Sequence, residues 1–159
     1  MHRFDDPTVN FLPGQPVRIR VLSHEPWGLM AEIIGDEDVG CSVDMIAGGS
    51  VTGSGPSRRE EFPPVGAEVD AVVQQVWRWR TDPPWIRLSI RRPDLDSFQW
   101  PCEYCLQPTT LSPGGDGVVI DVRSNDSSRV VQLTAHRACF SGHLHPESTE
   151  RTRADILGQ

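Results

Sequence analysis

The first half of the chain alternates hydrophobic and polar positions in the way expected of strands that bury one face. A long segment rich in Gly, Ser and Pro, residues 47–64, interrupts the alternation. The strands predicted from this pattern cover residues 17–21, 29–34, 39–43, 65–79 and 86–90. Five short strands with one long connection between the third and the fourth predict a small Greek-key barrel of the oligonucleotide-binding type, the OB-fold.

The second half carries a shorter strand pattern. Residues 118–122 and 130–133 are hydrophobic runs on either side of a polar turn at 124–127, which predicts a β-hairpin. Thr134 is expected to cap a short helix after the hairpin, and Trp100 and Phe140 to contribute to a small core. The whole chain is therefore predicted to be mainly β.

Composition narrows the range of partners. The 159 residues include 14 Gly and 14 Pro, which favours short strands joined by turns. The net charge is −7, and residues 14–95 and 96–159 each carry −3 of it; every cationic side chain is an arginine. Neither half is a basic domain, so any binding of nucleic acid is expected to be modest and local.

Two features bear on the compartment. No hydrophobic run reaches the roughly 18 residues needed to cross a bilayer, and the first residues lack the basic and apolar regions of a secretory signal. The sequence therefore predicts a cytoplasmic protein without a membrane partner. Cysteines stay reduced in that compartment, where closely spaced pairs bind metal more often than they form disulfides.

Three of the four cysteines fall in a metal-binding pattern. Cys102 and Cys105 are separated by two residues, and His136 and Cys139 follow with the spacing i and i+3. Three thiolates and one imidazole fill a tetrahedron with no open position, which is typical of a structural zinc site. His143 is the alternative fourth ligand. The remaining cysteine, Cys41, lies in a predicted strand and is expected to be a small buried hydrophobe.

These patterns divide the chain into four parts. A flexible leader, 1–13, precedes the OB-fold barrel, 14–95; a zinc-binding module, 96–145, and a tail without an assigned role, 146–159, follow. The zinc-binding module is too small to fold on apolar burial alone, so zinc is expected to supply much of its stability.

Five segments of the barrel, in chain order, read PGQPVRIRVL, PWGLMAEI, VGCSVDMI, VGAEVDAVVQQV and IRLSI. Together they resemble an RNA-binding domain that is repeated in the largest protein of the bacterial small ribosomal subunit, the ribosomal S-one domain. The resemblance covers about residues 14–92, roughly half of the chain. It implies an OB-fold that binds single-stranded RNA on one face of the barrel.

The family's RNA face uses two aromatic residues, a histidine, an acidic residue and a basic residue. Trp27 matches the first aromatic position, Met30 stands at the second, and Val43 stands at the histidine position. Trp77 occupies the acidic position and Trp85 the basic one. The resemblance therefore places the nucleic-acid face at Trp27, Met30, Trp77 and Trp85, and Arg87, which lies close to Trp85 in the sequence, is predicted to belong to the same face.

Tryptophan and arginine alternate near the predicted hairpin between the last two strands. Strict alternation places Trp77 and Trp79 on one face and Arg78 and Arg80 on the other, unless the strand bulges. Stacking of bases on aromatic rings contributes about 1–3 kcal/mol per base, so such a hairpin could bind single strands despite the acidic balance. For Trp79 and Trp85, packing against the protein is the favoured interpretation.

The spacing of the cysteines and histidine, with the aromatic residue after the last cysteine, also resembles the nick-sensing zinc finger of poly(ADP-ribose) polymerases. That resemblance covers about forty residues. The acidic balance of residues 96–159 disfavours the binding of DNA ends that it implies.

The sequence therefore predicts a non-catalytic protein that binds nucleic acid, with single-stranded RNA as the expected ligand and a structural zinc ion. The alternative is a zinc-stabilised adaptor or regulator that binds a protein and whose barrel has lost RNA binding. A zinc deaminase is disfavoured because its signature couples HxE with PCxxC, and HxE is absent here. The sequence also contains no GxSxG and no Gly-rich phosphate loop, so the chain is not expected to be an enzyme.

Overall fold

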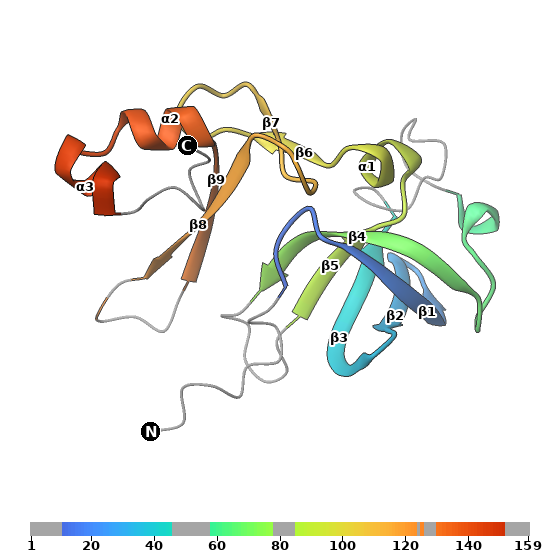
Figure 1. Cartoon of the computed structure of the whole chain (residues 1–159). Helices are drawn as coiled ribbons and strands as arrows, with labels where there is room; N and C mark the ends of the chain where they lie inside the picture. The colour runs from blue at the N-terminus through green and yellow to red at the C-terminus, as the bar shows by residue number, and fades with distance from the viewer. Residues whose placement is uncertain (1–10, 46–57, 78–84, 124, 126–129, 152–159) are drawn as a thin grey trace. The chain divides into compact units, whose positions relative to one another are not determined.

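The computed structural model describes residues 11–45, 58–77, 85–123, 125 and 130–151. The chain divides into two compact units, Met1–Phe98 and Gln99–Gln159 (Figure 1). Most of the expected leader, part of the expected tail, and Arg78, Trp79 and Arg80 lie outside the described residues. No helix in the described part of the chain is long and apolar enough to cross a membrane.

The first unit is a closed five-stranded barrel in which the strands follow the order β1-β2-β3-β5-β4. Its strands are β1 (Pro16–Glu25), β2 (Gly28–Ile33), β3 (Asp36–Asp44), β4 (Glu68–Trp77) and β5 (Trp85–Ser89). Strands β3 and β5 pair in parallel, whereas the other neighbours are antiparallel. The predicted mainly β class and five-stranded barrel are confirmed.

The hydrophobic alternation in the sequence corresponds to the inner face of this barrel. Every second residue of β2 and β5 is buried, and Ile19 and Val21 are buried on β1. The core consists of Phe11, Ile19, Val21, Leu29, Ala31, Ile33, Val39, Cys41, Val43, Phe62, Ala71, Val73, Val76, Ile86, Leu88 and Ile90. Phe11 belongs to it, so the packed part of this unit begins three positions before the expected boundary at Gly14.

Local structure departs from the sequence-based prediction in three places. Strand β3 begins at Asp36, three residues before the predicted start at residue 39. The short helices η1 (Arg59–Glu61) and α1 (Arg92–Asp96) were not predicted; α1 accepts Pro93 because a proline in the first turn loses no intrahelical hydrogen bond. Strand β4 bulges between Val73 and Gln75, which shifts the faces of the residues that follow.

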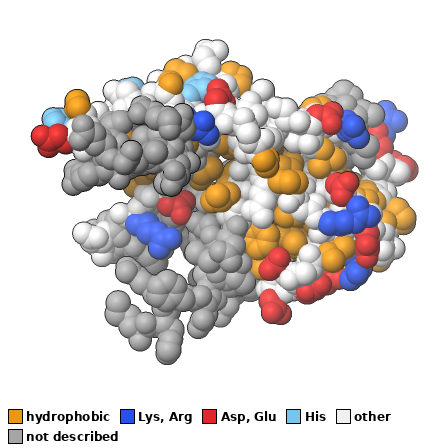
Figure 2. Space-filling model, viewed as in Figure 1, with side chains coloured by type: hydrophobic (Ala, Val, Ile, Leu, Met, Phe, Trp, Pro, Cys, Tyr) orange, Lys and Arg blue, Asp and Glu red, His pale blue; other side chains and the backbone are white. Residues whose placement is uncertain are grey.

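Arginine and acidic side chains form ion pairs on the outside of the barrel. Arg18 contacts Asp70 at 2.9 Å, and Arg20 contacts both Glu32 at 2.6 Å and Glu68 at 2.9 Å. The space-filling view shows arginine and acidic side chains interspersed on this unit (Figure 2). These exposed pairs balance the charge of the described arginines Arg18 and Arg20, although each pair contributes little to stability.

The second unit contains two small two-stranded sheets and two short helices. Strand β6 (Gln99–Pro101) pairs with β7 (Pro108–Thr110), and β8 (Gly117–Arg123) pairs with β9 (Val130–His136); α2 (Arg137–Gly142) and α3 (Pro146–Arg151) follow. The predicted hairpin is therefore present. Two-stranded sheets of this size are marginal by themselves, so the unit needs another source of stability.

The apolar core of the second unit is very small. Among its described residues, Cys102, Val118 and Ala135 form the buried cluster, with Ile120, Cys139 and Phe140 packed against it. Phe140 thus contributes to the small core, as predicted. Trp100 is half-buried on β6 and does not belong to this cluster.

Candidate metal centre

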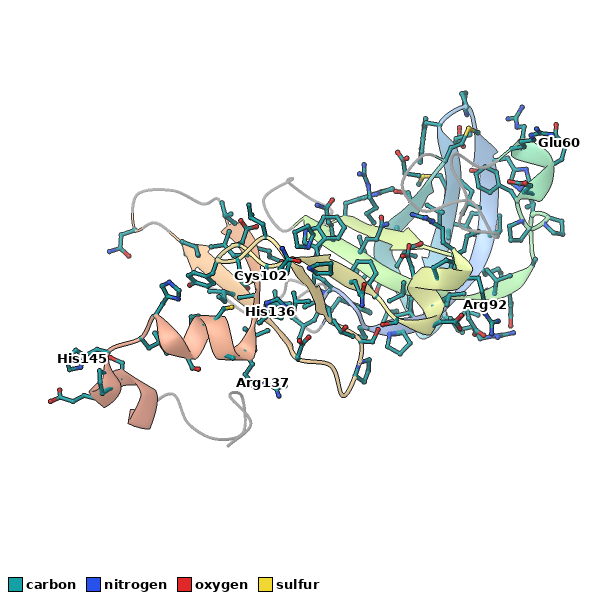
Figure 3. The ribbon with its side chains drawn as sticks, turned by 90° about the horizontal axis from the view of Figure 1, so that it is seen from above. Glu60, Arg92, Cys102, His136, Arg137 and His145 are labelled. Atoms are coloured by element: carbon teal, nitrogen blue, oxygen red, sulfur yellow. The ribbon has the colours of Figure 1, made fainter. Side chains whose placement is uncertain are left out.

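The structure brings the predicted ligands together. One sulfur or nitrogen atom from each of Cys102, Cys105, His136 and Cys139 lies within 4.8 Å of the other three, and these four could hold a metal ion. Figure 3 shows Cys102 and His136 side by side, although 33 residues separate them in the sequence. Cys102 is buried, Cys105 is exposed, and the other two are half-buried.

A tight turn after β6 presents the first two cysteines. The Cys102 amide donates to the carbonyl of Gln107 at 2.9 Å, and the Leu106 amide donates to the carbonyl of Cys102 at 2.8 Å. These bonds fold residues 103–105 back over Cys102, so both thiols point to one side. The turn places Leu106 in the left-handed region, with φ of 62°.

The other two ligands come from the junction between β9 and α2. His136 is the last residue of β9, and Cys139 is the third residue of α2. The predicted helix cap at Thr134 is wrong: Thr134 lies within β9, and its hydroxyl donates to the carbonyl of Pro101 at 2.7 Å. Because β9 extends to His136, the strand rather than a helix orients the imidazole, and Thr134 ties the two ligand-bearing segments together.

The separations between ligand atoms suit a tetrahedral site. His136 Nδ1 lies 3.3 Å from Cys105 Sγ and 3.7 Å from Cys139 Sγ. Bonds of about 2.3 Å to sulfur and about 2.0 Å to nitrogen place sulfur and nitrogen about 3.5 Å apart around tetrahedral zinc. The observed separations bracket that value, so an ion can bind with small movements of the side chains.

The hydrogen bonds of His136 select the ring nitrogen that faces the thiols. Its Nε2 lies 2.9 Å from the carbonyl oxygen of Pro108, which can only accept, so Nε2 carries the proton and Nδ1 keeps its lone pair. The carboxylate of Asp116 lies 3.8 Å from the same Nε2 and accepts hydrogen bonds from Thr109 and Thr110. Supporting contacts of this kind fix the orientation of metal-binding histidines.

The protein atoms around Cys102 stabilise its thiolate. Burial raises the pKa of Cys102, but hydrogen bonds from the backbone amides of His136, Cys105 and Tyr104 outweigh burial and lower it to about 6. Burial, together with hydrogen bonds to the two other thiols, raises the pKa of Cys139 to about 11. Three thiolates this close repel one another, so complete ionisation of the cluster requires a cation among them.

The alternative ligand, His143, has other partners. Its Nδ1 lies 2.7 Å from the carbonyl oxygen of Cys139, and its ring stacks on Tyr104 with centroids 4.4 Å apart. It is not part of the cluster. His145, at the start of α3, lies well away from Cys102 and His136 in Figure 3. The preference for His136 over His143 as the fourth member of the cluster is confirmed.

Cys41 behaves as the sequence suggested. It is fully buried in the barrel core, where its thiol donates to the carbonyl of Ala31 at 3.0 Å. Burial raises the pKa of this thiol to about 12, so it stays neutral at physiological pH.

Three of the predicted nucleic-acid residues, Met30, Trp85 and Arg87, lie on the outer face of the barrel. Met30 on β2 pairs with Ser42 on β3, and Ser42 pairs with Arg87 on β5, so the three form a row across the sheet. In the next row, Trp85 lies between Gly40 and Trp77 by register; the side chain of Trp77 is outside the description. Trp27, in the β1–β2 turn, is 46% exposed.

Several residues that shape these sites carried no signal in the sequence. The carbonyl of Pro108 and the carboxylate of Asp116 reach His136 only through the folding of β7 and the following loop. Gly40 and Ser42 contact Trp85 across the β3–β5 pairing. A parallel pairing between segments more than forty residues apart cannot be read from local alternation.

Substitution of Leu106 by glycine is expected to stabilise the second unit. Leu106 has φ of 62° and is 75% exposed, so glycine removes a left-handed strain of about 1–2 kcal/mol without loss of burial. The greater freedom of glycine in the unfolded chain offsets about 0.5–1 kcal/mol of this gain. Leu106→Gly should therefore raise the free energy of unfolding by about 0.5–1 kcal/mol. The free energy of unfolding can be measured by urea unfolding, with hydrogen exchange of the β8 and β9 amides as the probe. A decrease of the same size in Leu106→Gly would contradict the proposed strain at Leu106.

Comparison with known proteins does not assign the chain to a family. No protein-family model matches it, and no curated protein matches it. The metal centre is therefore inferred from the ligand set and its geometry alone.

Proposed function

We propose that Cys102, Cys105, His136 and Cys139 bind one structural zinc ion. The observation that carries this proposal is the convergence of three thiols and one correctly oriented imidazole within 4.8 Å. Thiolate and imidazole ligands in a tetrahedral set favour zinc over hard cations such as magnesium or calcium. Four protein ligands leave no position for a catalytic water, so the ion would hold the second unit together and would not take part in a reaction.

Metal analysis tests this directly. The purified protein is expected to contain one zinc per chain, and Cys102→Ser and His136→Ala are expected to lose it. Cys41→Ser is the matched control, because Cys41 lies in the barrel core and should leave the zinc content unchanged. Zinc-free wild-type protein that takes up none from solution would contradict the proposal.

Zinc affinity is expected to fall as the pH falls. Binding displaces the proton of Cys139, whose pKa of about 11 keeps it protonated at neutral pH in the metal-free protein. The pKa of Cys102 is lowered from 9.0 to about 6, and that of His136 is raised, chiefly by its hydrogen bond with Cys102, so protons compete with the metal for both ligands at mildly acidic pH. Competition with a chelating dye between pH 5 and 8 should show a loss of affinity that steepens toward pH 5, as His136 and Cys102 both become protonated. A constant affinity across this range would contradict the thiolate ligand set.

We further propose that the barrel binds single-stranded RNA without catalysis. The outer face of β2, β3 and β5 supports this, since it places Met30, Arg87 and Trp85 on neighbouring positions of one sheet. Arg87 lies 4.0 Å from Asp44, and both side chains are half-buried. The face therefore combines stacking surface with one donor and one acceptor group and has little excess charge, which suits bases more than phosphates.

Binding of a labelled single-stranded RNA at about 50 mM salt tests the proposed ligand. Wild-type protein should bind with modest affinity and a shallow dependence on salt, and Arg87→Ala should weaken the complex. Absence of binding at that salt concentration would contradict RNA binding.

One observation favours the alternative of a protein-binding adaptor. Val122 and Val131 face each other across the β8–β9 hairpin and are 47% and 55% exposed. They continue the apolar face formed by Val118 and Ala135, so the hairpin presents an uncovered hydrophobic strip.

A further inference from the structure

The indole ring of Trp85 packs against the backbone of a glycine on β3, Gly40. A Cβ atom added to Gly40 would lie 2.6 Å from Cζ3 and 2.7 Å from Cε3 of Trp85, so the six-membered ring lies directly against the backbone of Gly40. Every other amino acid at position 40 would displace the ring. This contact explains why a glycine occupies the middle of a strand, where it weakens the sheet in other contexts.

A hydrogen bond fixes the other end of the same ring. The indole Nε1 donates to the hydroxyl oxygen of Ser42 at 2.8 Å, and Ser42 is only 6% exposed. Gly40 and Ser42 lie two residues apart on the outer face of β3. The packing on Gly40 and the hydrogen bond to Ser42 together restrain both side-chain torsions of Trp85 in the absence of a ligand.

The restrained ring is not a core residue. Trp85 is half-buried and lies on the outer face of β5, whereas its neighbours Ile86 and Leu88 are fully buried inside the barrel. Packing against the protein, the role favoured from sequence, therefore uses one side of the ring and leaves part of it accessible. Arg87 projects from the same face two residues further along β5 and can contact the edge or the phosphate of a stacked nucleotide.

We propose that Trp85 is a pre-oriented platform on which an unpaired nucleobase stacks, and that Gly40 and Ser42 are its positioning residues. The inference rests on the proposed binding of single-stranded nucleic acid by the barrel. A platform that lies flat on a sheet accepts a base whose faces are free, and bases inside a duplex already stack on their neighbours. Single strands are therefore the ligand class, and stacking that tolerates every base implies little sequence preference.

The test uses the full-length protein with its zinc and a fluorescein-labelled 12-nucleotide oligoadenylate RNA at about 50 mM salt, with binding measured by anisotropy. Trp85→Leu should weaken binding about 5- to 100-fold, the range expected for one lost stacking contact. Trp85→Phe keeps a flat ring but loses the hydrogen bond to Ser42, so it should bind more weakly than wild type and more tightly than Trp85→Leu. Gly40→Ala displaces the ring and should weaken binding about 3- to 10-fold.

Gly142→Ala is the matched control for Gly40→Ala. Gly142→Ala adds the same methyl group where no atom lies within 4 Å and should change nothing. If circular dichroism shows that Trp85→Leu does not fold, the RNA affinities of Gly40→Ala and Trp85→Phe test the platform instead. RNA that binds wild type equally well as a duplex, or binding that Trp85→Leu and Gly40→Ala leave intact, overturns the platform but not the RNA-binding proposal. Absence of wild-type binding overturns both.

Discussion

Removal of zinc by a chelator at neutral pH is expected to unfold the second unit and to leave the barrel folded. In the part of the second unit that the structure describes, the buried cluster consists of Cys102, Val118 and Ala135, and the sheets have two strands each. Apolar burial of this extent cannot offset the conformational entropy of about fifty ordered residues. Structural zinc in small modules supplies about 10–16 kcal/mol of apparent binding free energy, so the metal is expected to decide whether this unit folds.

Hydrogen exchange read by mass spectrometry distinguishes the two units in the intact chain. After chelation, the amides of β8 and β9 should exchange within seconds, whereas those of β1 to β5 should keep their protection. Cys105→Ser should reproduce the effect without a chelator, since Cys105 is exposed and its side chain has no packing role to lose. Readdition of zinc should restore protection in wild type only. Protection of β8 and β9 that survives metal removal would show that the unit does not need zinc.

The barrel and the cluster of three cysteines and one histidine could be predicted from sequence because both leave local signals. Alternation in β1, β2 and β5 reflects a side-chain period of two residues, and a closed barrel enforces that period on every strand. The spacing of Cys102 and Cys105 reflects the reach of one tight turn. His136 and Cys139 join Cys102 and Cys105 in one cluster, as predicted, even though the expected helix cap was wrong, since their spacing suits a strand-to-helix junction as well as a helix.

The remaining features depend on contacts between distant segments. The bulge in β4 arises where Val73 and Gln75 must both satisfy their pairing with β5, and no residue in that segment signals it. The parallel pairing of β3 with β5 brings Gly40 and Ser42 to Trp85, and the folding of the loop before β8 brings Asp116 to His136. Sequence alternation specifies which residues turn inward, whereas the partners on the outer face follow from register.

The pairing register of β2 with β3 also makes the barrel sensitive to substitution of Gly28, at the start of β2. Gly28 has φ of +157°, and a Cβ atom there would lie 2.0 Å from the carbonyl oxygen of Val43. The obstacle is backbone on the paired strand β3, so relief requires β2 and β3 to separate at this end. Gly28→Ala should lower the free energy of unfolding of the barrel by about 3 kcal/mol or more, because overpacking adds to the strain of an unfavourable φ.

Gly35→Ala provides the matched control in the same unit. Gly35 also has a positive φ, +94°, but no atom lies within 4 Å of the added methyl group. Only conformational strain of about 1–2 kcal/mol should result. Urea denaturation followed by circular dichroism compares the two variants, and zinc content should stay at the wild-type level in both because the ligands belong to the other unit. Equal destabilisation by the two substitutions would mean that φ alone matters; a larger loss for Gly28→Ala would assign the difference to the β2–β3 backbone contact.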